Sequence, residues 1–176
     1  MPVSQQAWSS YSQNRQRFRV LIMSGLYGLI EPEERIQNYD VHLTDTHRDT
    51  GHSVASMWSE LYTEMLNNYI SQSYAGRKVH IVNLLCDTDY VDAILWHKLS
   101  PNCSVFHLAS PTLRHKALLP PAGTIFDALL REPGRLDTLE RSVPLDISSF
   151  GKPPDGLSGT QLIFDRYIGE SKKSNV

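Results

Sequence analysis

Residues 20–40 read VLIMSGLYGLIEPEERIQNYD. The apolar run from Val20 to Met23 leads into a turn of small residues with glycines at positions 25 and 28. Such glycines mark places where the backbone bends sharply or approaches another group closely. Polar and aromatic side chains follow directly: Tyr27, Glu31, Arg35, Gln37, Tyr39 and Asp40. A strand that ends in this way indicates a ligand-binding edge, although closure of a tight turn explains the glycines equally well.

Segments with the composition of strands alternate with segments of helical periodicity. Near-continuous apolar runs at residues 18–24, 78–85 and 104–108 are interpreted as buried strands. Apolar positions at helical spacing after Ser53, and again after Asp87, predict two helices between these strands. A strand–helix–strand–helix–strand order is typical of a parallel sheet. We therefore predict an α/β fold, a single domain with a mostly parallel central sheet flanked by helices.

The 176 residues suit one domain with a sizeable core. We expect residues 1–17 to form a short helix or a loosely held arm, and residues 18–168 to form the α/β domain. Residues 169–176 are expected to be a flexible tail. Inside the domain, residues 124–131 have the pattern of a short helix and residues 161–168 that of a last strand.

Charge and cysteine content restrict the classes of function. Lys and Arg number 17 against 19 Asp and Glu, which gives a net charge of −2. This balance argues against a protein whose whole surface binds nucleic acid. The two cysteines, Cys86 and Cys103, are too few for a disulfide scaffold or a zinc ribbon. No run approaches the roughly 20 apolar residues of a membrane helix, and the N-terminus does not have the pattern of a signal peptide. We expect a cytoplasmic protein with no membrane partner and no cofactor.

No standard catalytic motif is present. Residues 24–28 match neither a nucleophile elbow nor a P-loop. His42, His47 and His52 are spaced by five residues, which does not place them on one helix face, so we interpret them as a solvated loop rather than a metal site. Asn83 stands out because a polar side chain at the end of a buried strand needs a hydrogen-bond partner. Asp87, by contrast, is interpreted as a helix cap.

Four blocks of sequence resemble the YaaA peroxide-stress protein family. They occur in the order that the family shows, and the first is the most specific. The blocks are Leu-Ile-Met-Ser-Gly-Leu-Tyr-Gly-Leu-Ile-Glu-Pro at 21–32 with Ile-Gln-Asn-Tyr at 36–39, Met-Trp at 57–58, Val-Asn-Leu-Leu-Cys-Asp-Thr-Asp-Tyr at 82–90, and Gly-Thr-Gln-Leu-Ile-Phe-Asp-Arg-Tyr at 159–167.

The resemblance implies a cytoplasmic α/β protein of the peroxide-stress response, with DNA binding in a positively charged cleft and no established reaction. The chain departs from the family pattern in two ways. We expect it to lack the family's N-terminal half, and residues 108–116 replace a basic segment that follows the third strand in the family. Glu31 also stands where the family often has arginine, and Asp40 where arginine can follow the tyrosine, so the pocket is expected to be more acidic.

Two hypotheses of function follow. In the first, a nucleic acid or nucleotide binds in a cleft at the carboxyl ends of the strands, lined by Ser24, Gly25, Tyr27, Gly28, Gln37, Tyr39, Asn83, Tyr90 and Arg166. In the second, the protein is an enzyme on a small nucleotide or nucleoside, with Asp40 or Glu31 as acid/base and Arg166 holding an anion. A ligand-free interaction module is a third alternative. The sequence does not indicate the oligomeric state.

Overall fold

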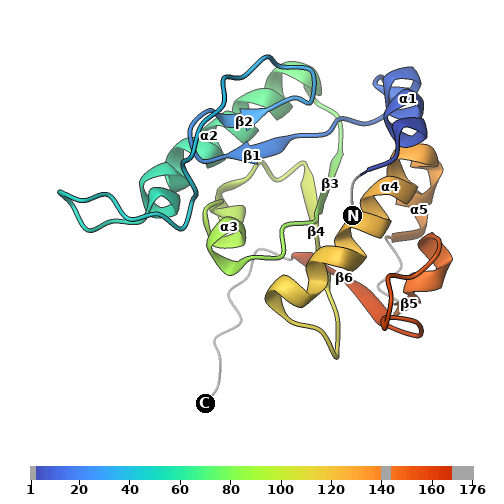
Figure 1. Ribbon diagram of the computed structural model, residues 1–176. Helices are drawn as coiled ribbons and strands as arrows, with labels where there is room; N and C mark the ends of the chain where they lie inside the picture. The colour runs from blue at the N-terminus through green and yellow to red at the C-terminus, as the bar shows by residue number, and fades with distance from the viewer. Residues whose placement is uncertain (1–2, 140–143, 168–176) are drawn as a thin grey trace.

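The computed structural model describes residues 3–139 and 144–167 (Figure 1). The tail that we expected at residues 169–176 lies outside these ranges. The helices are α1 (Gln5–Asn14), α2 (Val54–Ser73), α3 (Thr88–Asp92), α4 (Leu119–Arg131) and α5 (Leu136–Leu139). The strands are β1 (Ile22–Ser24), β2 (Gly28–Ile30), β3 (Val79–Asn83), β4 (Cys103–Ala109), β5 (Leu145–Asp146) and β6 (Gln161–Tyr167). Four single-turn 3₁₀ helices connect them: η1 (Trp96–Lys98), η2 (His115–Leu118), η3 (Pro133–Arg135) and η4 (Ile147–Phe150).

The chain has the predicted α/β class, but the prediction of a mostly parallel sheet is wrong. The larger sheet has the order β3-β4-β6-β5. Only β3 and β4 run parallel; β6 is antiparallel to both β4 and β5. β3 and β4, which are connected through α3 and η1, therefore form the parallel pair that the sequence predicted, whereas β6 runs in the opposite direction after a long connection.

The first predicted strand does not join this sheet. β1 pairs instead with β2 in a two-stranded antiparallel hairpin, in which Ser24 lies opposite Gly28. Residues 25–27 are the connection of that hairpin. Gly28 has φ +79°, a conformation that glycine adopts at little cost. The turn that we singled out in the sequence is thus the tip of a hairpin and does not follow a strand of the larger sheet.

The helices begin where capping residues stand. The Ser53 side chain accepts from the backbone N–H of Ser56 at the start of α2, and Asp87 accepts from Asp89 at the start of α3. α3 ends after five residues at Asp92, and a turn and a bend separate it from η1. α4 begins earlier than the predicted residue 124, since Pro120 and Pro121 occupy its first turn, where the missing N–H groups of proline cost nothing.

The larger sheet has one face toward α4 and one toward α2 and α3 (Figure 1). On the α4 face, Phe106, Leu108 and Phe164 pack against Ile125 and Leu129. On the other face, Val79, Ile81 and Cys103 pack against α2 and α3. Successive side chains of a strand point to opposite faces of the sheet. Whether a position in β3, β4 or β6 is odd or even therefore decides which face its side chain occupies.

Candidate functional site

Ser24, at the end of β1, is the centre of a cluster of hydrogen bonds that we name the tyrosine hub (Ser24, Tyr27, Tyr39 and Tyr62). The buried Ser24 hydroxyl lies 2.7 Å from the Tyr39 hydroxyl and accepts from the backbone N–H of Tyr27 at 3.0 Å. The Tyr62 hydroxyl donates to the Ser24 carbonyl at 2.5 Å. The rings of Tyr27 and Tyr39 meet edge to face at 5.5 Å, and the Tyr27 hydroxyl accepts from the Gln37 N–H. The hub therefore fastens the loop that carries Gln37 and Tyr39 to the hairpin.

Tyr90 of α3 belongs to the same neighbourhood. Burial, followed by the nearby phenols of Tyr90 and Tyr39, raises the pKa of Tyr62 well above its ordinary value. Tyr62 therefore stays protonated at every physiological pH, and its O–H remains a donor. Ser24, Tyr27, Gln37, Tyr39 and Tyr90 are thus brought together.

The two candidate glycines of the hairpin are buried against protein. A Cβ on Gly25 would lie 2.5 Å from the backbone oxygen of Val41, and a Cβ on Gly28 would lie 2.8 Å from the end of Met65. Both glycines allow close packing of the chain on itself. Nearby, an open hollow of about 460 Å³ lies over Asn38, Tyr39 and Asp40; with only three lining residues it is a surface concavity.

Asn83 lies apart from the hub, in a row that crosses three strands. Asn83 of β3 is the register partner of His107 in β4, and His107 is the partner of Asp165 in β6. We call these three residues the polar row; they share the α2/α3 face. The ring of Trp96 meets the His107 ring edge to face at 4.8 Å. Because α3 carries Tyr90 and the adjoining η1 carries Trp96, the segment 88–98 contributes to both the hub and the row.

The hydrogen bonds of Asn83 fix the tautomer of His107. The Leu85 backbone N–H donates to Asn83 Oδ1 at 3.0 Å, which identifies Oδ1 as the acceptor end of the amide. Asn83 Nδ2 therefore faces His107 Nδ1 as a donor, at 2.8 Å. An imidazole nitrogen that accepts carries no hydrogen, so the proton of neutral His107 is on Nε2.

We expect the pKa of His107 to be lower than that of an ordinary histidine. Burial lowers its pKa from 6.5, and the negative charge of Asp165 opposes part of that effect. Asp165→Asn should therefore lower the pKa of His107 further. Because the unfolded chain then binds the proton more readily than the folded one, the free energy of unfolding should fall as pH drops below about 6.5. An NMR titration of the imidazole resonances measures both effects, and a midpoint at or above 6.5 would contradict this environment.

Arg166 is on the opposite face of the sheet from Asn83. It follows Asp165 directly and pairs in register with Phe106, whose ring packs on the α4 side. Its guanidinium donates to the Ser104 hydroxyl at 3.2 Å. The sheet itself therefore lies between Arg166 and the polar row, and these candidates do not converge on one pocket.

The two candidate acid/base groups lie in different environments. The Glu31 carboxylate pairs with Arg15 at 2.7 Å and accepts from the Tyr69 hydroxyl at 2.7 Å. The Asp40 carboxylate is fully exposed, 3.6 Å from His42. Glu31 is thus engaged in joining the end of α1 to α2, and Asp40 extends into solvent.

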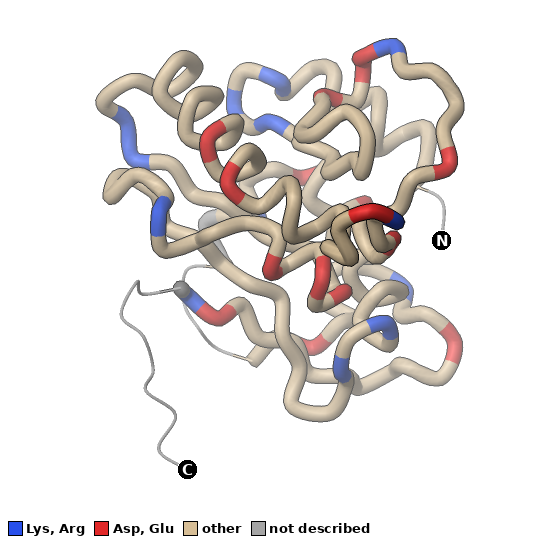
Figure 2. Tube along the Cα trace, turned by 90° about the vertical axis from the view of Figure 1, so that its left-hand side faces the viewer, with Lys and Arg blue, Asp and Glu red and all other residues tan. Residues whose placement is uncertain are grey.

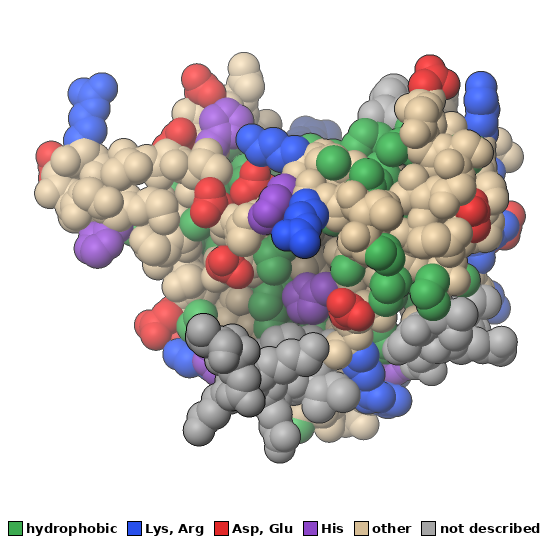
Figure 3. Space-filling view, turned by 90° about the horizontal axis from the view of Figure 1, so that it is seen from below, with side chains coloured by type: hydrophobic (Ala, Val, Ile, Leu, Met, Phe, Trp, Pro, Cys, Tyr) green, Lys and Arg blue, Asp and Glu red, His purple; other side chains and the backbone are tan. Residues whose placement is uncertain are grey.

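The segments that follow β3 and β4 meet at the carboxyl ends of these strands. Thr88 Oγ1 lies 3.1 Å from His115 Nδ1, and Lys116 Nζ lies 4.0 Å from Asp87. His115 adopts φ 49°, which is uncommon for a residue with a side chain. Figure 3 shows histidine, basic and acidic side chains close together around hydrophobic ones on the lower side of the molecule. Basic and acidic residues are also intermingled along the chain in Figure 2.

Within residues 3–139 and 144–167 no group of three His, Cys, Asp or Glu side chains could hold a metal ion.

His107, Trp96 and Asp165 were not among the residues that we singled out in the sequence. His107 is a polar residue within an otherwise apolar strand, and that placement indicates a buried side chain that needs a hydrogen-bond partner. Its pairing with Asn83 depends on the register of β3 against β4, which no local pattern specifies.

Comparison with known proteins gives one family and a group of short matches. The family profile "Peroxide stress protein YaaA" matches residues 4–110, a range that includes the hub, Asn83 and His107 but neither Asp165 nor Arg166. Proteins named UPF0246 from Francisella tularensis subsp. novicida (strain U112) and subsp. mediasiatica (strain FSC147) are 32% identical over 84 residues. The match covers 48% of this chain and 30% of each relative. No solved structure gives a significant match.

Proposed function

The chain belongs to the YaaA peroxide stress protein family, and from this premise we propose that it acts in the peroxide-stress response by binding a nucleotide-like ligand, either free or within a nucleic acid. The ligand binds at the carboxyl ends of β3 and β4, against the polar row. The matched residues 4–110 include both strands and the segment between them. No helix in the described ranges is both long and apolar enough to cross a bilayer.

The polar row is the observation that carries the proposal. Asn83 and His107 are hydrogen-bonded to each other with defined donor and acceptor atoms, and Trp96 borders His107. An imidazole bordered by an indole ring suits a planar ligand that stacks and forms hydrogen bonds, such as a nucleobase.

Charge favours a ligand with few phosphate contacts. The net charge is −2, and Lys116 and His115 are each close to a side chain of the 87–88 turn. A long basic track along a duplex would need clustered Lys and Arg. The ligand is therefore a mononucleotide, a nucleoside or a short single-stranded stretch rather than an extended duplex.

Equilibrium titrations test this function. Adenosine, adenosine monophosphate and labelled single- and double-stranded oligonucleotides are added to the protein at several salt concentrations, with tryptophan fluorescence or anisotropy as the signal. We expect saturable binding, with single strands preferred over duplexes. For oligonucleotides the slope of log K against log salt should correspond to only about one to three phosphate contacts. Absence of binding by every member of the panel at the lowest salt concentration would reject the proposal.

A further inference from the structure

We propose that the opposite face of the sheet carries a separate binding site for a small oxyanion of the phosphate class, formed by Lys78, Ser104, Phe106 and Arg166. These residues line a hollow of about 70 Å³. A single water needs roughly 10–15 Å³ by the same kind of measure, so the hollow has room for one tetrahedral oxyanion but not for a nucleotide.

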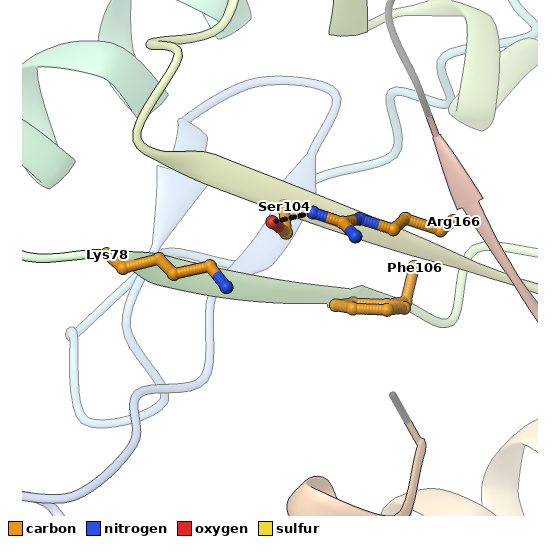
Figure 4. Close-up of a pocket in the computed structure, with 4 residues that line it drawn as sticks. All are labelled: Lys78, Ser104, Phe106 and Arg166. Carbon is orange, nitrogen blue, oxygen red and sulfur yellow. Dashed lines mark hydrogen bonds between the residues drawn. The ribbon is translucent and has the colours of Figure 1, made fainter. Parts of the chain in front are cut away.

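Three strands supply the four residues to one face. Lys78 immediately precedes β3, Ser104 and Phe106 are two apart on β4, and Arg166 pairs in register with Phe106. Figure 4 shows the ammonium of Lys78 and the guanidinium of Arg166 reaching toward the same space from opposite sides, with Ser104 between them and the Phe106 ring beside Arg166. The charged ends of two long side chains are thus directed at one place.

Every polar group in the hollow can donate. The Arg166 guanidinium uses one N–H on Ser104 and keeps its other donors, and the Lys78 ammonium has three. Because arginine cannot accept, the Ser104 oxygen is the acceptor of that bond and its own O–H stays able to donate. Ser104 is only 7% exposed, so this donor is largely shielded from solvent.

Neither cation is neutralised by a carboxylate. Within residues 3–139 and 144–167 no Asp or Glu oxygen forms an ion pair with Lys78 or Arg166, although seven other basic side chains in those ranges lie within 4.0 Å of a carboxylate oxygen. Two like charges that face one hollow repel each other, and an anion between them removes that repulsion. The buried ring of Phe106 keeps water from one side and strengthens the attraction.

Titration with inorganic phosphate, followed by ¹H–¹⁵N NMR at constant ionic strength, tests the site. We expect saturable shifts at Ser104 and at the Arg166 side chain. Arg166→Gln should weaken binding by about tenfold or more, and Lys78→Gln by about threefold to tenfold, since each removes a charge-assisted contact. Lys98→Gln, which removes an exposed lysine paired with Glu60, is the matched control and should leave the affinity unchanged.

Three further arms make the result decisive. Glycerol phosphate should bind like phosphate if the site takes a phosphoryl group of a larger molecule, and more weakly if it takes the free ion. Equal shifts with chloride, or an unchanged affinity in Arg166→Gln, would overturn the proposal. A His107→Gln variant should keep its phosphate affinity, because His107 lies on the other face of the sheet. Phosphate binding and nucleotide binding are therefore tested independently, and either proposal can be rejected without rejecting the other. Thermal unfolding of each variant without phosphate verifies that the fold is kept.

Discussion

Replacing Gly25 with alanine is expected to destabilise the protein by about 3 kcal/mol. The new Cβ would lie 2.5 Å from the backbone oxygen of Val41. A backbone atom cannot rotate away as a flexible side chain can, so the loop that carries Tyr39 must move off the hairpin. That movement separates the hydroxyls of Tyr39 and Ser24, which are 2.7 Å apart. Chemical denaturation monitored by circular dichroism measures the loss.

Two other glycines give the comparison. Gly134 has open space around its missing Cβ and no positive φ, so Gly134→Ala should be neutral or stabilise by up to about 1 kcal/mol. The loss of stability in Gly28→Ala should lie between those of Gly25→Ala and Gly134→Ala. This substitution combines φ +79° with a contact to the movable end of Met65. A Gly25→Ala protein as stable as Gly134→Ala would show that the loop does not pack on the hairpin as described.

The Cys86 thiol is expected to react with peroxide and with alkylating reagents about a hundredfold more slowly than an ordinary thiol at neutral pH. Burial raises its pKa from 9.0 to about 11, and the reactive thiolate is correspondingly scarcer. Burial also raises the pKa of Cys103. Neither thiol therefore has the lowered pKa that is typical of a rapid peroxide sensor.

Alkylation kinetics of a Cys103→Ser protein isolate Cys86. The rate should rise with pH to about 11 and should reach that of an ordinary thiol at any pH once the chain is unfolded in guanidinium. The resulting pH dependence of stability has the opposite sign to that of His107. Since the unfolded chain ionises near pH 9.0 and the folded one only near 11, the stability that Cys86 contributes is present below pH 9 and is lost above it. Rapid alkylation of the folded protein at neutral pH would contradict this environment.

Much of the secondary structure could be predicted from local patterns. Periodicity and capping predicted α2 after Ser53 and α3 after Asp87, and apolar runs predicted β3, β4 and β6. The direction of β6 could not be predicted in this way. An apolar run such as residues 161–168 has the same composition whether its strand runs parallel or antiparallel, and only the path of the preceding chain decides the direction.

The site was predictable where neighbours are close in sequence. Ser24, Tyr27, Gln37 and Tyr39 lie within sixteen residues, and the hub joins them. Asn83 and Arg166 were grouped with them on the assumption that all strand ends meet at one edge. That assumption fails for Arg166, because β6 is antiparallel and its register with β4 places residue 166 beside Phe106 and residue 165 beside His107. A one-residue shift in that register would move each of these two side chains to the other face of the sheet.

The affinity for adenosine of two matched glutamine variants tests the central claim, that the nucleotide-like ligand binds on the α2/α3 face of the sheet. Adenosine carries no phosphate and so does not report on the hollow at Arg166. His107→Gln and Arg166→Gln alter side chains on neighbouring strands but on opposite faces. We expect His107→Gln to raise the Kd about tenfold, the value of one well-placed hydrogen bond, and Arg166→Gln to leave it within about twofold. Equal weakening by both variants, or a Kd that changes only in Arg166→Gln, would contradict the claim.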